Sequence, residues 1–125
     1  TREESNICTD GLLGGKPHPR VYGAFPRVIG KFVREMKAMT LEEAIYKMTN
    51  KPAKTFKIDN RGLLKEGYFA DIVIFDENTT IDKGTFTDPI QFPEGISHVI
   101  VNGEVVIDNF VKNEKFAGKV IRINK

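Results

Sequence analysis

The chain has 125 residues, 40% hydrophobic and 29% charged, which is the balance of a globular protein with room for one hydrophobic core. Its 19 basic and 17 acidic side chains are interspersed and leave a net charge of only +2, which argues against nucleic acid as a partner. No apolar run is long enough to span a membrane, and the single cysteine, Cys8, excludes an internal disulfide and favours a cytoplasmic location.

The first part of the chain carries the pattern of a functional site. Residues 5–9 predict a short buried strand, which runs directly into Thr9-Asp10-Gly11. Glycines and prolines in residues 10–24 predict a loop, and this loop contains Pro17-His18-Pro19-Arg20. A carboxylate at the end of a strand, followed by a loop with a histidine and an arginine, is typical of α/β enzymes, whose chemistry lies at strand ends.

Helices are predicted after this loop. Residues 25–36 should form an amphipathic helix with Pro26 in its first turn, because apolar side chains recur at helical spacing: Phe25, Val28, Ile29, Phe32, Val33 and Met36. Thr40 and Glu43 form a capping box, which predicts a second helix from Thr40 to about Asn50. Pro52 can open a third, short helix that reaches Phe56.

The second half carries β-sheet patterns instead. Residues 71–76 hold four consecutive apolar residues and predict a strand buried on both faces. The proline-containing residues 77–95 predict a long loop.

A hairpin is predicted next, because Asn102-Gly103 is a strong type I′ turn signal between strands at His98–Val101 and Val105–Asp108. Residues 120–123 predict a last strand. The predicted fold class is therefore α+β, with helices first and sheet second.

Motifs along nearly the whole chain resemble the C-terminal part of the N-acyl-D-amino-acid deacylases (D-aminoacylases) of the amidohydrolase superfamily. The similar segments include Thr9-Asp10-Gly11, Pro17-His18-Pro19-Arg20, Gly23-x-Phe25-Pro26-Arg27-Val28, Leu41-Glu42-Glu43-Ala44, Gly67-x-x-Ala70-Asp71 and Val101-Asn102-Gly103. The glycine-containing pattern that ends at Asp71 occurs across the superfamily. The PHPR segment with the following GxFPRV is much more specific to the D-aminoacylase branch.

The resemblance implies a metal-dependent (β/α)8 barrel plus a small β-sandwich, the composite β domain, to which both chain ends contribute. Residues 1–57 would then be the end of the barrel, with residues 5–9 as its eighth strand, and residues 58–125 would be the C-terminal share of the sandwich. The chain begins at Thr1 rather than methionine, and we expect it to be part of a longer protein. Because open sheet edges recruit other strands, we also expect self-association through the unpaired edge.

The resemblance further implies that Asp10 is both a ligand of the catalytic zinc and the catalytic carboxylate. In the superfamily, this carboxylate takes a proton from the metal-bound water that attacks the substrate amide and passes it to the leaving nitrogen. Zinc lowers the pKa of bound water to about 7, so a nearby carboxylate can act as a base. The substrate would be a small N-acyl-D-amino acid. Without the resemblance, Asp10-Gly11 is more simply a turn.

Arg20 and His18 are the candidate substrate-binding residues. A guanidinium offers two parallel donors to a carboxylate, so Arg20 could bind the substrate carboxylate, although a surface arginine fits the pattern equally well. His18 lies between two prolines and could bind substrate or metal, although a lone histidine is more often an ordinary hydrogen-bonding residue. We expect Arg27 to pair with a nearby acid and Cys8 to be a small buried side chain.

The chain departs from the family pattern at residues 12–16, where the sequence LLGGK replaces polar residues that include a histidine and an acid. Because of this departure, the resemblance does not establish which substrate is preferred. A zinc hydrolase also needs three or four protein ligands, whereas this chain has two histidines, one cysteine and no HxH or HExxH pattern. We therefore predict that these residues alone neither bind the catalytic zinc nor hydrolyse a substrate.

Two alternatives remain open at the level of sequence. The first is another amidohydrolase branch that acts on cyclic amides, such as the dihydropyrimidinases or dihydroorotases. The second is a non-catalytic β-module that binds a partner.

Overall fold

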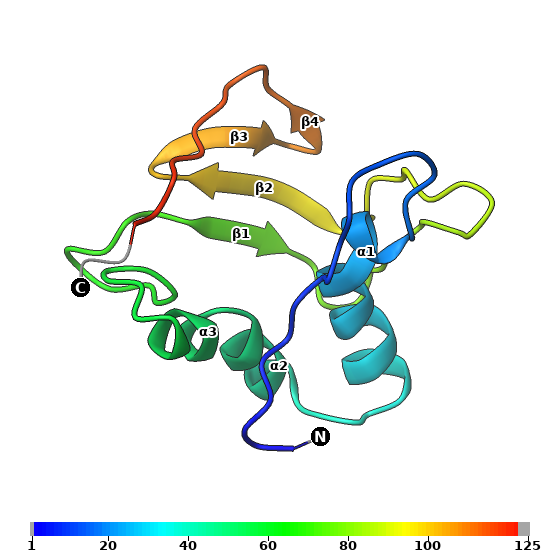
Figure 1. Cartoon of the computed structure of the whole chain (residues 1–125), viewed down its shortest axis with the longest axis horizontal. Helices are drawn as coiled ribbons and strands as arrows, with labels where there is room; N and C mark the ends of the chain where they lie inside the picture. Colours follow the sequence, from blue (N-terminus) through cyan, green and yellow to red (C-terminus); the bar gives the residue numbers. More distant parts are fainter. Residues whose placement is uncertain (1, 123–125) are drawn as a thin grey trace.

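The computed structural model describes residues 2–122, with helices in the first half and an antiparallel sheet in the second (Figure 1). The elements are α1 (Arg20–Arg27), the π-helix η1 (Val28–Glu35), α2 (Leu41–Met48), α3 (Asn50–Thr55), β1 (Ile72–Phe75), β2 (Ile96–Val101), β3 (Glu104–Asp108) and β4 (Val111–Lys112). The predicted α+β class is confirmed. Within residues 2–122, no helix is both long and apolar enough to cross a membrane.

The first helix begins earlier than predicted, at Arg20 instead of residue 25, so the end of the predicted loop was wrong. Pro19 stands before it with a helical φ of −52°, because the proline ring restricts φ to values that suit a helix start. Pro26 consequently lies inside the helix and not in its first turn. Because proline cannot donate to the helical ladder, it interrupts the α pattern just before the π-helix begins at Val28.

The second helix follows its capping signal. Thr40 Oγ1 accepts a hydrogen bond from the Glu43 N–H over 3.2 Å, and Glu43 Oε2 accepts one from the Thr40 N–H over 3.0 Å. The predicted capping box is therefore confirmed. The third helix begins at Asn50 and not at Pro52, because Pro52 fits within the first turn, where a missing N–H is harmless.

Both predicted terminal strands were wrong. Residues 5–9 belong to no strand, because they contact helix α2 and not a strand that could form a ladder: the Ile7 N–H donates to Lys47 O over 3.2 Å. Residues 120–122 are likewise outside any strand, and residue 123 lies outside the described residues.

The sheet has the order β1-β2-β3-β4, and all neighbouring strands are antiparallel. The predicted hairpin is confirmed: Asn102 (φ 51°) and Gly103 (φ 84°) connect β2 to β3 with the positive φ values of a type I′ turn. A second tight turn at Asn109 (φ 45°) and Phe110 (φ 68°) leads to β4, which the sequence did not predict.

Strand β1 is an edge strand, and its prediction as a strand buried on both faces was wrong. Val73 is 51% exposed and Ile74 is 49% exposed. The small buried core lies instead in the helices, at Val28, Ile29, Ala44 and Ala53. The long connection between β1 and β2 runs beside α1 and brings the second half of the chain to the predicted site (Figure 1).

Candidate functional site

Asp10 and Arg20 form an ion pair at the start of helix α1. Arg20 Nη2 lies 2.8 Å from Asp10 Oδ2, and Arg20 Nε donates to the backbone oxygen of Asp10 over 2.9 Å. Asp10 adopts a left-handed backbone conformation with φ 45°, which a short polar residue tolerates. Both side chains reach solvent, at 80% exposure for Asp10 and 44% for Arg20. The ion pair therefore lies at the surface of the chain, in contact with solvent.

His18 completes this group of predicted site residues. Its Nδ1 accepts a hydrogen bond from the Arg20 N–H over 3.1 Å, and this assigns the ring proton of the neutral form to Nε2. The Phe86 ring packs edge-on against the imidazole, with 5.0 Å between the centroids. The structure thus brings Asp10, His18 and Arg20 together, and Phe86 joins them from the long connection after β1.

Arg27 pairs with a residue that the sequence did not predict. Arg27 Nη1 lies 2.9 Å from Asp82 Oδ2, which confirms that Arg27 pairs with an acid, and the Asp82 side chain is only 7% exposed. No local motif marks Asp82, because the two residues are 55 positions apart. Cys8 is exposed, so the prediction of a small buried side chain was wrong; the segment around it packs on no sheet.

The described residues do not by themselves fit a zinc ion. Residues 2–122 contain no group of three or more His, Cys, Asp or Glu side chains arranged to hold a metal. Asp10 is a single carboxylate, and its Oδ2 already accepts from Arg20. A catalytic zinc site takes three protein ligands and a water, so Asp10 would need partners from elsewhere.

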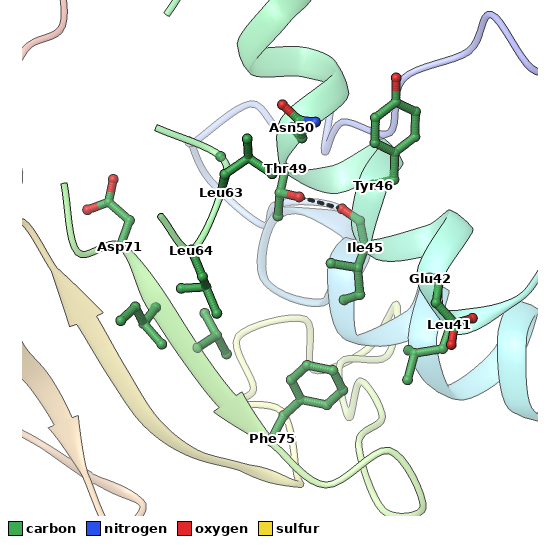
Figure 2. Close-up of a pocket in the computed structure, with 13 residues that line it drawn as sticks. Leu41, Glu42, Ile45, Tyr46, Thr49, Asn50, Leu63, Leu64, Asp71 and Phe75 are labelled. Atoms are coloured by element: carbon green, nitrogen blue, oxygen red, sulfur yellow. Dashed lines mark hydrogen bonds between the residues drawn. The ribbon is translucent and has the colours of Figure 1, made fainter. Parts of the chain in front are cut away.

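A separate apolar groove of about 570 Å³ lies between α2 and β1 (Figure 2). Leu63 and Leu64 lie between the two elements, with Ile45 on α2 across the groove and Phe75 at the end of β1. None of the predicted site residues lines this groove. Its apolar lining suits the packing of another segment better than it suits acid–base chemistry.

A family model described as the amidohydrolase family matches residues 13–107. The chain belongs to the amidohydrolase family. Among curated relatives of this amidohydrolase chain, an N-acyl-D-glutamate deacylase of Alcaligenes xylosoxydans xylosoxydans is 42% identical over 117 residues. That match covers 93% of this chain and 24% of the relative. A D-aminoacylase from the same organism is 42% identical over 116 residues, 92% of this chain and 24% of the relative.

Solved structures of amidohydrolases show the same arrangement. A crystal structure of a D-aminoacylase is 40% identical with a TM-score of 0.88, over 92% of this chain and 24% of that chain. An N-acyl-D-glutamate deacylase from Bordetella bronchiseptica, complexed with zinc and a phosphonate inhibitor, is 44% identical with a TM-score of 0.79, over 81% and 22%. The chain therefore spans about a quarter of the length of the relatives that it matches.

The dihydroorotases, which belong to the alternative branch that acts on cyclic amides, also match, over a shorter part of the chain. A dihydroorotase of Lactobacillus gasseri is 45% identical over 100 residues, which cover 71% of this chain and 23% of the relative. The deacylase relatives match more than nine-tenths of the chain. The breadth of the match thus favours the deacylase branch of the amidohydrolase family.

Proposed function

We propose that this chain is the C-terminal part of a zinc-dependent N-acyl-D-amino-acid deacylase, which hydrolyses an amide to a carboxylate and a free D-amino acid. The observation that carries the proposal is the convergence of Asp10, His18 and Arg20 at the start of α1, with Arg20 and Asp10 2.8 Å apart. The deacylase relatives support it, since they match most of the chain. Residues 1–57 would be the end of the barrel and residues 58–125 a share of the sandwich.

In this proposal Arg20 binds the carboxylate of the substrate. In this chain its Nε and Nη2 donate to the backbone oxygen and to Oδ2 of Asp10, over 2.9 and 2.8 Å. The substrate carboxylate would take the place of these contacts, because a guanidinium offers two parallel donors to a planar anion. Asp10 is the catalytic carboxylate that accepts and returns a proton. His18 positions Arg20 through the N–H···Nδ1 hydrogen bond and presents Nε2 to the substrate.

Zinc belongs to the complete enzyme in this proposal, with Asp10 as one ligand and the others outside this chain. We predict that the 125-residue protein, purified and dialysed, contains far less than one zinc per chain by elemental analysis and hydrolyses no N-acyl-D-amino acid. A stoichiometric zinc content would contradict this, and His18, His98, Cys8 and Asp10 would then be the ligands to mutate.

Activity is tested in a chimera, because the proposal places the remaining ligands outside this chain. Residues 1–125 replace the matching segment of the Alcaligenes D-aminoacylase, which is 42% identical. We expect the chimera to hydrolyse N-acetyl-D-methionine and not its L isomer, and D10N to lower kcat by about 10²- to 10⁴-fold, the usual worth of a general acid–base residue.

Substrate binding is tested in the same chimera. R20K should raise KM, because lysine cannot form the paired hydrogen bonds of a guanidinium. H18Q should reduce activity, and H98Q is its matched control, because His98 pairs with Asp108 on the sheet over 3.3 Å. Equal effects of H18Q and H98Q would contradict the role of His18.

The cyclic-amide alternative is addressed by the same graft placed in the dihydroorotase of Lactobacillus gasseri. The deacylase proposal predicts that only the D-aminoacylase chimera keeps its activity, because the D-aminoacylase matches 92% of this chain and the dihydroorotase only 71%. An active dihydroorotase chimera with an inactive deacylase chimera would favour the rival branch. Inactivity of both, with both proteins folded, would favour a non-catalytic β-module.

We also propose that the isolated chain self-associates through β1. This strand lies at the edge of the sheet, is wholly apolar (IVIF) and borders the apolar groove. Edge strands without charge or proline readily pair with another strand.

A further inference from the structure

One face of the α1–η1 helical segment is held closely against residues 77–82. A methyl group on Gly23 would lie 2.6 Å from Asp82 Cβ, and one on Gly30 would lie 2.7 Å from Thr80 O. Further along the same face, Arg34 Nη1 donates to Glu77 O over 2.8 Å and to Thr80 O over 2.9 Å. The helix therefore has little freedom to shift along or rotate against this segment.

The ion pair between Arg27 and Asp82 lies in the middle of this contact. The Asp82 side chain is 7% exposed, whereas Arg27 is 47% exposed and donates to it over 2.9 Å. A carboxylate that is removed from water needs its partner, because an unpaired buried charge is strongly unfavourable. The neighbouring pair, Lys83 and Glu94, has both side chains about half exposed and is expected to contribute little.

The same connection continues from Asp82 to the candidate site. A methyl group on Gly84 would lie 3.3 Å from Pro19 Cβ, and Phe86 packs against His18 with 5.0 Å between ring centroids. His18 in turn accepts from the Arg20 N–H. The connection after β1 thus contacts α1 on the face that carries Arg27 and also contacts the residues that precede Arg20.

We propose that Asp82 is a positioning residue. Through Arg27 and the close approach at Gly23, it fixes α1 so that the Arg20 guanidinium is directed at Asp10. A residue of the sheet-forming half therefore sets the geometry of a site built by the first half. The value of this geometry to catalysis rests on the proposed deacylase function, but the positioning itself is a property of this chain and is measured without substrate.

The test uses NMR of the ¹⁵N-labelled 125-residue chain, with exchange of the Arg20 Nε–H against water as the readout. That proton is hydrogen-bonded to Asp10 O over 2.9 Å in the native geometry. We expect D82N to accelerate its exchange by about tenfold or more, because the substitution removes the charge-assisted hydrogen bond to Arg27. The loss of such a bond commonly costs more free energy than a tenfold change represents. The matched control K83Q should leave the exchange rate unchanged.

A conservative variant separates positioning from general damage to the fold. R27K keeps a charged donor for Asp82 and should retain slow exchange, whereas R27Q should lose it. Amide protection in the β2–β3 hairpin reports whether the rest of the chain is intact. If D82N also removes this protection, the comparison of R27K with R27Q, which change only the half-exposed partner of the ion pair, tests the positioning role instead.

Slow Arg20 exchange in D82N or R27Q would overturn the proposal, as would equal effects of D82N and K83Q. The deacylase function is judged separately, by activity of the chimera. An inactive wild-type chimera with fast Arg20 exchange in D82N would reject the deacylase proposal and leave the positioning role of Asp82 standing.

Discussion

At the scale of single residues, several charges in this chain are held by atoms that are distant in the sequence. The clearest case is Lys47, which is only 6% exposed. Its Nζ donates to the carbonyl oxygens of Arg2 over 2.7 Å and of Ser5 over 3.2 Å. An ammonium group that is removed from water must be hydrogen-bonded, so Lys47 attaches the first residues to helix α2.

The carboxyl group of Asp76 leads to a prediction about how the stability of the chain depends on pH. The Asn78 N–H donates to Asp76 Oδ1 over 2.8 Å and lowers the pKa of this carboxyl below its ordinary value. The folded chain therefore holds the charged form better than the unfolded chain does. The resulting stabilisation is present above the unfolded pKa of about 3.9 and is lost as pH falls through the lower folded pKa.

We expect D76N to make stability less dependent on pH in this acid range. Urea unfolding at a series of pH values measures it, with E77Q as a control that removes the same charge one residue along. If D76N keeps the steep acid loss of the wild type, the turn at Asp76 does not contribute to the pH dependence.

At the scale of elements, the α1–η1 segment shows why glycine occurs within a helix. A glycine normally destabilises a helix by about 1 kcal/mol relative to alanine. At Gly30 the absence of a side chain lets the helix approach Thr80 O, which would lie 2.7 Å from an added Cβ. The Ile81 side chain also occupies that space. Close packing of the helix against the connection after β1 therefore outweighs helix propensity.

We predict that G30A destabilises the chain by about 1–3 kcal/mol, the usual cost of overpacking, in spite of the better helix propensity of alanine. Urea unfolding followed by circular dichroism measures the change. G14A is the control, because its added methyl would meet no atom within 4 Å. A G30A variant as stable as the wild type would show that Thr80 and Ile81 can move away at little cost.

At the scale of the whole molecule, apolar surface remains exposed between the helices and the sheet. Leu64 is 81% exposed and Val73 is 51% exposed, and both line the groove between α2 and β1. This apolar surface lies at the side of β1, the edge strand of the sheet. In the isolated chain the same surface favours association of two copies.

Self-association can be measured by sedimentation velocity over a range of concentrations. We expect the wild type to show a concentration-dependent dimer and V73K to abolish it, because a lysine at a sheet edge opposes strand pairing. V111K is the matched control: Val111 is 65% exposed on the opposite edge strand, β4, which has only two residues. A wild type that stays monomeric at high concentration, or an equal effect of V111K, would contradict the role of β1.

Sequence patterns that span only a few residues determined the start of a helix and a turn of this protein, and also indicated its candidate site. The capping box at Thr40 and the turn at Asn102-Gly103 form as predicted, because each depends on atoms only a few residues apart. Asp10, His18 and Arg20 could be recognised as one candidate group for the same reason, since one short segment contains all of them.

Only the tertiary structure decided the features that depend on distant partners. Residues 5–9 form no strand because they meet helix α2, and β1 is half exposed because it lies at the sheet edge. Arg27 finds Asp82, and His18 meets Phe86, across a long stretch of intervening chain. A local pattern contains no information on which remote segment will pack against it, so these contacts appear only once the whole chain has folded.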